Sequence, residues 1–268
     1  MLDFLEQMAA ESARRAAESR AQTPEAEIRR AAEAMPPARP LTLPGGELAV
    51  IAEIKRVSPA AGALNEQVNP AAQAQLYEAA GAVAVSVITE PLRFQGSIAD
   101  LRAARAATSL PIMRKDFIGD AYQLYEARAA GADGVLLIAA MLSDRELRHY
   151  LRVCEYLGLF ALVECFNAGD ITRAQDGGAG VIGVNCRNLR DLSVEPERFE
   201  KLRGLIAPGN VAVAESGITT PAQFEAVRTL GYHAALIGSA LMQAADPVAA
   251  LARLRGQLLV SRQNGGRP

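Results

Sequence analysis

One unit recurs along this chain of 268 residues. A stretch of helical character, rich in Ala, Leu and Arg, leads to a glycine, which precedes a short apolar run that ends in a polar residue. The glycines stand at Gly81, Gly131, Gly178 and Gly231. A glycine at the end of a helix can adopt the positive φ that turns the chain towards a strand. The recurrence therefore predicts alternating helices and strands.

Eight apolar runs are candidate strands. They cover residues 49–55, 83–90, 111–115, 134–140, 160–164, 181–185, 211–215 and 234–238. The runs are continuously apolar, which is typical of parallel strands covered by helices. An open, doubly wound sheet is the alternative, but no GxGxxG follows the first run and polar residues end many of the runs, as closure into a barrel would arrange. We therefore expect an α/β fold, a (β/α)8 TIM barrel with an N-terminal helical extension.

The barrel is expected to occupy residues 47–258, behind an N-terminal extension. Residues 1 to about 35 predict a helix with Leu2, Leu5 and Met8 as an apolar stripe, and the prolines of residues 36–46 predict a linker. Two interpretations of the extension stay open, a frayed surface arm and a lid over the barrel mouth. Residues 259–268 are expected to form a flexible tail without a role.

The composition of the chain limits the classes of molecule that it is expected to bind. A formal net charge of -2 gives no general attraction to nucleic acid or to an acidic membrane surface. The longest apolar runs are strand-sized, and the N-terminus lacks the residue order of a signal peptide. Only three cysteines occur and none forms a CxxC pair, so neither a disulfide framework nor a zinc site is indicated. We expect a cytoplasmic protein that binds a small molecule, with no nucleic-acid or membrane partner.

Charged and polar side chains end most of the expected strands. The groups that carry out chemistry in parallel barrels lie at the carboxyl ends of the strands. Each of these residues alone would be an ordinary solvated side chain, but three cations and three carboxylates on one rim would pair with one another and shift each other's pKa. The set comprises Glu53, Lys55, Lys115, Glu164, Asn185, Arg187 and Glu215. We expect an active site here, organised around Lys115.

Small residues after the last two strands predict a phosphate site. Ser216 and Gly217 follow the seventh strand, and Gly238 and Ser239 follow the eighth, just before an expected helix. Backbone N–H groups at such turns, together with a helix N-terminus, favour an oxyanion. The long loop of residues 56–62 after the first strand is expected to close over a ligand.

Other side chains near the rim are less specific. Phe94 and Phe117 follow the second and third strands, where each either faces an aromatic ligand or caps the core. Cysteine catalysis is not expected, because the two histidines, His149 and His233, are placed in a helix and at the opposite rim. With few histidines and no acidic cluster at ligand spacing, we expect a site without metal.

Read in order, these segments resemble the indole-3-glycerol phosphate synthase family of tryptophan biosynthesis. The resemblance runs from about residue 48 to about residue 250 and rests on the segments IAEIKRVSPAAG, VSVITEPLRFQGS, PIMRKDFIGDAYQLYEARAAGAD, LVE, GVNCRNL, AESGI and LIGSALM. It implies that 1-(2-carboxyphenylamino)-1-deoxyribulose 5-phosphate closes its ring and loses CO2 and water, without cofactor or metal. It also implies that the N-terminal extension packs near the barrel mouth.

The resemblance also implies roles for single residues. Lys115 matches the general acid and should be protonated in the resting enzyme, Glu164 and Lys55 match the residues of the other proton transfers, and Glu53 matches a catalytic carboxylate beside them. The residues that would hold the anthranilate and hydroxyl groups are Asn185, Arg187, Glu215 and Ser216, with Phe94 and Phe117 facing the ring. The residues that match the phosphate site are Ser58, Gly217, Gly238 and Ser239.

Two rival interpretations stay open. One is another phosphosugar-binding barrel, such as phosphoribosylanthranilate isomerase, which works with a cysteine at the end of the first strand, where this chain has Glu53 and Lys55. The other is a catalytically silent barrel that binds a phosphorylated ligand. The joint presence of Lys55, Lys115 and Glu164 argues against silence.

The chain departs from the family pattern in two places. Cys165 and Phe166 stand where the family often has Val-His, and Cys186 stands where it often has Asn or Ser. These side chains alternate away from the expected site, so we expect the chemistry to be unchanged. The protein is expected to be a monomer, with at most weak association with other tryptophan-pathway enzymes.

Overall fold

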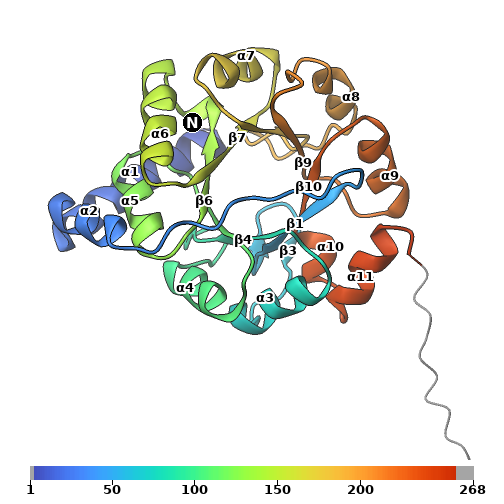
Figure 1. The fold of residues 1–268 in the computed structure, drawn as a ribbon, viewed down its shortest axis with the longest axis horizontal. Helices are drawn as coiled ribbons and strands as arrows, with labels where there is room; N and C mark the ends of the chain where they lie inside the picture. Colours follow the sequence, from blue (N-terminus) through green and yellow to red (C-terminus); the bar gives the residue numbers. More distant parts are fainter. Residues whose placement is uncertain (1–2, 258–268) are drawn as a thin grey trace, which may run out of the picture.

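The computed structural model describes residues 3–257, which fold into a closed barrel of eight parallel strands (Figure 1). Neighbours around the barrel follow the order β1-β10-β9-β8-β7-β6-β5-β4. The strands are β1 (Ala49–Ile54), β4 (Ala84–Ile88), β5 (Ile112–Lys115), β6 (Gly134–Ile138), β7 (Phe160–Cys165), β8 (Val181–Asn185), β9 (Val211–Glu215) and β10 (Ala234–Ile237). The predicted (β/α)8 barrel is confirmed.

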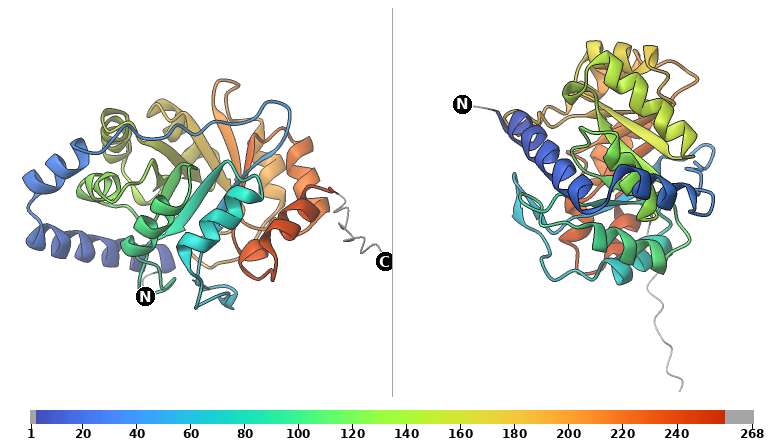
Figure 2. Two further views of the ribbon diagram at one scale, coloured as in Figure 1. Left: turned by 60° about the horizontal axis from the view of Figure 1, so that its bottom comes forward. Right: turned by 90° about the vertical axis from the view of Figure 1, so that its left-hand side faces the viewer.

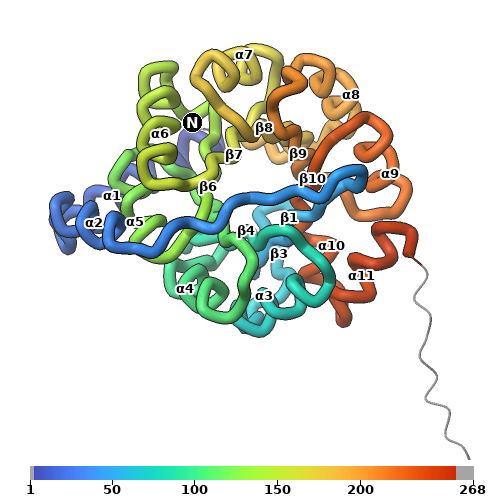
Figure 3. Tube along the Cα trace, viewed as in Figure 1, coloured from blue at the N-terminus to red at the C-terminus, as the bar shows by residue number. Residues whose placement is uncertain are grey.

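Helices surround the strands, as the tube in Figure 3 shows. They are α3 (Pro70–Ala79), α4 (Ile98–Ala107), α5 (Tyr122–Ala129), α6 (Asp144–Tyr156), α7 (Ala168–Asp176), α8 (Glu197–Arg203), α9 (Pro221–Thr229), α10 (Ser239–Met242) and α11 (Pro247–Leu254), with a 3-10 turn at η1 (Ala139–Met141). The glycines expected to end helices do adopt positive φ, for example 96° at Gly131. The long loop after β1 is a small hairpin of β2 (Val57–Ser58) and β3 (Gly62–Ala63).

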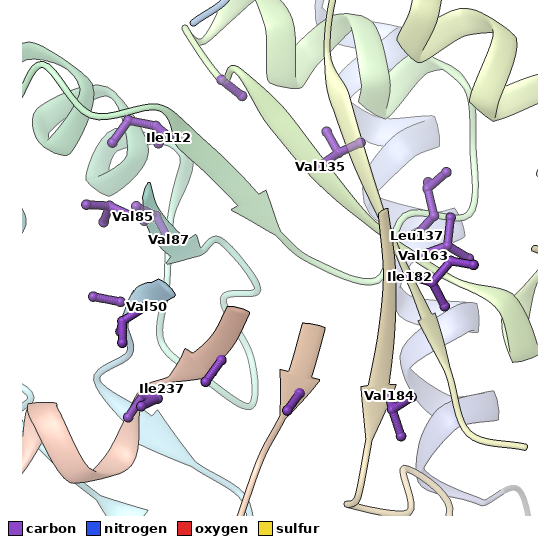
Figure 4. Packing of buried hydrophobic residues seen from close by; sticks show 14 of the residues in the cluster. Val50, Val85, Val87, Ile112, Val135, Leu137, Val163, Ile182, Val184 and Ile237 are labelled. Atoms are coloured by element: carbon purple, nitrogen blue, oxygen red, sulfur yellow. The ribbon is translucent and has the colours of Figure 1, made fainter. Parts of the chain in front are cut away.

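Alternation along each strand divides the core into two layers. Outward-facing side chains pack under the helices, and Figure 4 labels Val50, Val85, Val87, Ile112, Val135, Leu137, Val163, Ile182, Val184 and Ile237 among them. Inward-facing side chains such as Ile51, Met113 and Leu136 fill the barrel itself. Because the inward positions of β1 continue from Ile51 to Glu53, the same alternation that builds the core places a carboxylate at the barrel mouth.

The N-terminal extension differs from the single helix predicted to about residue 35. It forms two helices, α1 (Phe4–Gln22) and α2 (Glu25–Glu33). The break falls at Thr23 and Pro24, where the proline has no backbone N–H to continue α1. Of the predicted apolar stripe, Leu5 and Met8 are buried, whereas Leu2 and the tail of residues 259–268 lie outside the described residues.

The extension covers both ends of the barrel. Figures 1 and 2 show residues 36–46, which form no helix or strand, crossing one side of the barrel towards β1, while α1 lies along the other side. Leu5 and Met8 of α1 belong to the inner core, and Leu41 and Leu43 of the linker pack against it. The packing of α1 against the inner core argues against the frayed arm, and the role of a lid stays a prediction.

Candidate active site

The carboxyl ends of the strands surround a cavity of about 340 Å³. This volume is within the range of small-molecule sites. Thirteen of the fourteen residues predicted for the site line it, and the fourteenth, Glu215, lies fully buried directly behind Lys115. The sequence pattern therefore located one common site. The individual roles of these residues remain predictions.

Lys115 lies at the centre of the charged groups. Its Nζ is 3.2 Å from Oε2 of Glu215 and 3.4 Å from Oε2 of Glu53, and Lys55 Nζ is 2.8 Å from the other Glu53 oxygen. Burial alone would lower the pKa of the Lys115 ammonium, but the carboxylates of Glu53, Glu215 and Glu164 outweigh burial and raise that pKa above its ordinary value. Lys115 is therefore protonated at neutral pH.

The three carboxylates around Lys115 have different environments. Burial would raise the pKa of Glu53, but the ammonium groups of Lys55 and Lys115 lower it below its usual range. For Glu164 burial dominates and raises the pKa, although Lys115 and the Asn185 side chain oppose it. Burial also raises the pKa of Glu215, and the nearby Glu164 carboxylate adds to that effect. Groups whose pKa values are driven apart are suited to separate acid and base roles.

Two glycines, one inside β8 and one directly after β10, leave room for two of these carboxylates. A Cβ atom on Gly183 would collide with Oε1 of Glu215, and one on Gly238 would collide with Oε1 of Glu53. Gly238, predicted for the phosphate site, therefore also accommodates Glu53. Gly183 was not predicted from the sequence. The signal for Gly183 was an isolated glycine inside an apolar strand, which often marks a place where another group lies close against the backbone.

The predicted phosphate end combines three loops. Ser216 and Gly217 both adopt left-handed backbone conformations, with φ of 68° and 69°. A Cβ on Gly217 would stand 2.8 Å from Cys186 Sγ, so this turn requires a residue without a side chain. Ser58 and Ser239 line the same cavity. The predicted helix after β10 is the short α10, which begins at Ser239.

Aromatic rings form another wall of the cavity. The Phe94 and Phe117 ring centroids are 6.1 Å apart, and Phe4 of α1 packs edge-on against Phe117 at the same separation. Phe117 is buried, as a side chain that caps the core would be, and it also lines the cavity. Its contact with an aromatic ligand stays a prediction. Phe4 was missed, and its signal was its position beside the apolar stripe of Leu5 and Met8.

Asn185 and Arg187 continue the wall from the end of β8. The Asn185 side-chain oxygen accepts a hydrogen bond of 2.9 Å from the Arg187 backbone N–H, and the Arg187 guanidinium donates to the Leu192 carbonyl at 2.9 Å. These bonds hold the loop that places Leu189 and Leu192 against the cavity.

The histidines and cysteines to which the sequence assigned no catalytic role lie away from the cavity. His149 is in α6, and His233 precedes β10, where its Nδ1 accepts the Ala212 N–H at 2.8 Å. Cys165 and Cys186 point outwards into the helical layer of the core. Within residues 3–257 no group of three or more His, Cys, Asp or Glu side chains is arranged to hold a metal ion. No helix in the same range could cross a membrane.

Solved structures that resemble this one share the barrel. A 3-hexulose-6-phosphate synthase covers 78% of this chain and 99% of its own, with a TM-score of 0.61 and 16% identity. Thiamine phosphate pyrophosphorylase from Pyrococcus furiosus covers 78% of this chain and 94% of its own, with a TM-score of 0.58 and 19% identity. At these identities the likeness supports the fold alone.

Sequence relatives are much closer. Residues 5–254 match the family model described as indole-3-glycerol phosphate synthase. The relative of that name from Leifsonia xyli is 43% identical over 95% of this chain and 99% of its own length. Its counterpart from Micrococcus luteus is 48% identical over 82% of each chain. The chain therefore belongs to the indole-3-glycerol phosphate synthase family.

Proposed function

We propose that this protein converts 1-(2-carboxyphenylamino)-1-deoxyribulose 5-phosphate into indole-3-glycerol phosphate, CO2 and water, a step of tryptophan biosynthesis. The observation that carries the proposal is the Lys115 ammonium, held between Glu53 and Glu215 at the mouth of the barrel. It faces a cavity with an aromatic wall on Phe94 and Phe117. A substrate with an aromatic ring, a carboxylate and a phosphate requires these features together.

Ring closure needs an acid at the ketone. The ring carbon that bears the carboxylate attacks the ketone carbon, and Lys115 donates a proton to the ketone oxygen as the new bond forms. The carboxylate then leaves as CO2, and its bonding electron pair returns to the ring. An ammonium close to the reacting atoms stabilises the negative charge that develops on the oxygen.

Dehydration needs a second acid and a base. The new hydroxyl leaves as water after it accepts a proton, and a base takes up the proton that the ring system loses. Glu164 suits this work because burial raises the pKa of its carboxyl above the ordinary value, which makes it a better proton acceptor. Lys55 is the second group we assign to these transfers. Glu53 forms ion pairs with Lys55 and Lys115 and holds the two side chains beside each other.

The remaining residues bind the substrate. We assign the anthranilate and hydroxyl groups to Asn185, Arg187 and Ser216, which line the cavity, and we propose that Glu215 acts on them through its contact with Lys115. We assign the phosphate to Ser58, Gly217, Gly238 and Ser239, whose small side chains let backbone N–H groups approach an oxyanion. No metal or cofactor is required by this scheme.

We further propose that the enzyme works as a monomer in the cytoplasm on a phosphorylated small molecule, with at most weak association with other tryptophan-pathway enzymes. The free cysteines Cys154, Cys165 and Cys186, all buried, suit a reducing compartment. Size-exclusion chromatography with light scattering tests the monomer.

The direct test is an assay of the purified protein with the carboxyphenylamino-deoxyribulose phosphate in buffer containing EDTA. Indole fluorescence reports product, and we expect turnover without added metal. Absence of product above background would refute the proposed function.

A further inference from the structure

The carboxylate of Glu90 is buried two residues past the end of β4, beside the cavity, and has no part in the chemistry described above. Its Oε1 accepts the Leu92 N–H at 2.9 Å, and its Oε2 accepts the N–H groups of Arg93 at 2.7 Å and Phe94 at 3.0 Å. The Glu90 carbonyl accepts the Gly96 N–H at 2.8 Å. Side chain and main chain of one residue therefore hold the whole loop of residues 91–96.

This loop has little freedom to move. Gln95 adopts a left-handed conformation with φ of 55°, which is uncommon for a residue with a side chain. A Cβ on Gly96 would collide with the Ile88 carbonyl, so the loop lies directly against the end of its strand. Such a conformation persists only where surrounding contacts determine it, and the Glu90 carboxylate supplies three of them.

The loop carries one wall of the cavity. Phe94 stands in its middle, and its ring packs against that of Phe117 with 6.1 Å between centroids. Its backbone N–H is one of the three groups bound by Glu90. The position of the Phe94 ring is therefore coupled directly to the Glu90 carboxylate.

A buried carboxylate is a costly way to hold a loop. Its charge is offset here by three N–H donors and by the electrostatic interaction with the Arg15 guanidinium of α1. A neutral side chain could not accept all three hydrogen bonds, because an amide has only one acceptor oxygen. The loop therefore requires a carboxylate at position 90, because only a carboxylate can bind its three N–H groups together.

We propose that Glu90 is a positioning residue, which fixes the Phe94 ring in the orientation that receives the aromatic ring of the substrate. This inference rests on the proposed function for the identity of the ligand. It acts on binding through Phe94, and Glu90 does not transfer protons. Since the substrate is anionic, loss of the Glu90 charge by itself would strengthen binding. If substitution of Glu90 weakens substrate binding, the cause must therefore be the altered position of the Phe94 ring and not the lost charge.

The first experiment compares Glu90→Gln, Phe94→Leu and the double variant in steady-state assays. We expect KM to rise about tenfold in each single variant, because Glu90→Gln loses about one charge-assisted hydrogen bond and Phe94→Leu loses the ring itself, while kcat stays within about threefold. If Glu90 acts through Phe94, the double variant will have a KM no higher than that of Phe94→Leu. A KM unchanged by Glu90→Gln, or two effects that multiply fully in the double variant, would overturn the proposal.

Asp133→Asn is the matched control. Asp133 is as fully buried as Glu90 and likewise binds backbone N–H groups, those of Ile112 and Arg39, but at the opposite rim of the barrel. Both substitutions should lower Tm, and only Glu90→Gln should raise KM. If KM rose equally in Asp133→Asn, the change in Glu90→Gln would follow from a general loss of stability, and the positioning role would be refuted.

A second experiment needs no substrate. The chain contains no tryptophan, so Phe94→Trp introduces a single tryptophan at the site, whose emission can be excited apart from that of the six tyrosines. We expect Glu90→Gln in this background to increase the acrylamide quenching of its emission at least twofold, and Asp133→Asn to leave quenching unchanged. Unchanged quenching in Glu90→Gln would refute the positioning role. If the parent protein had no synthase activity but Glu90→Gln still increased the quenching, the proposed function would be refuted and the positioning role of Glu90 would stand.

Discussion

The Nζ atom of Lys115 lies 3.2 Å from Oε2 of Glu215, although the two residues stand 100 positions apart in the chain. Lys115 ends β5 and Glu215 ends β9, so closure of the barrel brings them together. Glu215 does not line the cavity and reaches it through the lysine. This relationship supplies the cavity with an ammonium whose position and charge are fixed before substrate arrives.

Replacement of Lys115 by methionine should remove the general acid and keep the apolar stem. We expect kcat to fall at least on the order of a hundredfold, with the fold and ligand binding retained. The measurement is steady-state indole fluorescence, with circular dichroism as the control for folding. A near-native kcat would show that another group protonates the ketone.

Much of this site was predictable because its signals are local. The glycines that end helices locate the strand starts, and the period of two along a strand places Glu53 on the same face as Ile51. Once the barrel was inferred, polar residues at the strand ends had to share one rim. Lys115 and Glu164, from different strands, could therefore be assigned to one site without any knowledge of distances.

The missed residues depend on contacts that no local pattern contains. Phe4 reaches the cavity only because α1 folds back over the barrel mouth, and Gly183 matters because Glu215 comes from another strand. Glu90 stood in the sequence as one more strand-end charge, and only the structure shows its three backbone partners. The break at Pro24, by contrast, was readable from the sequence.

Gly183→Ala should displace the Glu215 carboxylate, because the new methyl group would occupy the space of Oε1. With the Lys115 ion pair disturbed, we expect kcat to fall about tenfold and Tm to decrease, as for an overpacked core position. Gly180→Ala is the control, since nothing lies within 4 Å of the place that its new methyl group would take. Equal behaviour of the two variants would remove the argument that Gly183 makes room for Glu215.

The stability of the protein should fall as pH rises from about 5 to about 9, in part because of Glu215. Burial raises the pKa of Glu215 to about 8 from 4.5, so at neutral pH the folded state holds a proton on this carboxyl, while the ionised Glu53 balances the charge of Lys115. The stability from that proton is complete below pH 4.5 and is lost as pH rises through the folded pKa. Glu215→Gln mimics the protonated acid, and its Tm should depend less on pH across this range. An identical pH dependence in both proteins would contradict the assignment.

Arg15 on α1 makes a two-point ion pair with Asp116, at 2.8 and 3.1 Å, one residue beyond Lys115. Asp116 is buried and also bound by Arg114 and Thr89, so loss of Arg15 leaves the carboxylate partly compensated. We expect Arg15→Met to lower the free energy of unfolding by about 2 kcal/mol, below the usual penalty for breaking a buried pair. Because α1 carries Phe4 to the cavity, KM should also rise several-fold.

Arg14→Met on the same helix removes only exposed pairs with Glu11 and Glu18, so its unfolding free energy and KM should stay near the parent values. Urea denaturation gives the unfolding free energy of the two variants, and steady-state kinetics gives their KM. If Arg15→Met matched Arg14→Met in both quantities, apolar packing alone would hold α1 over the site.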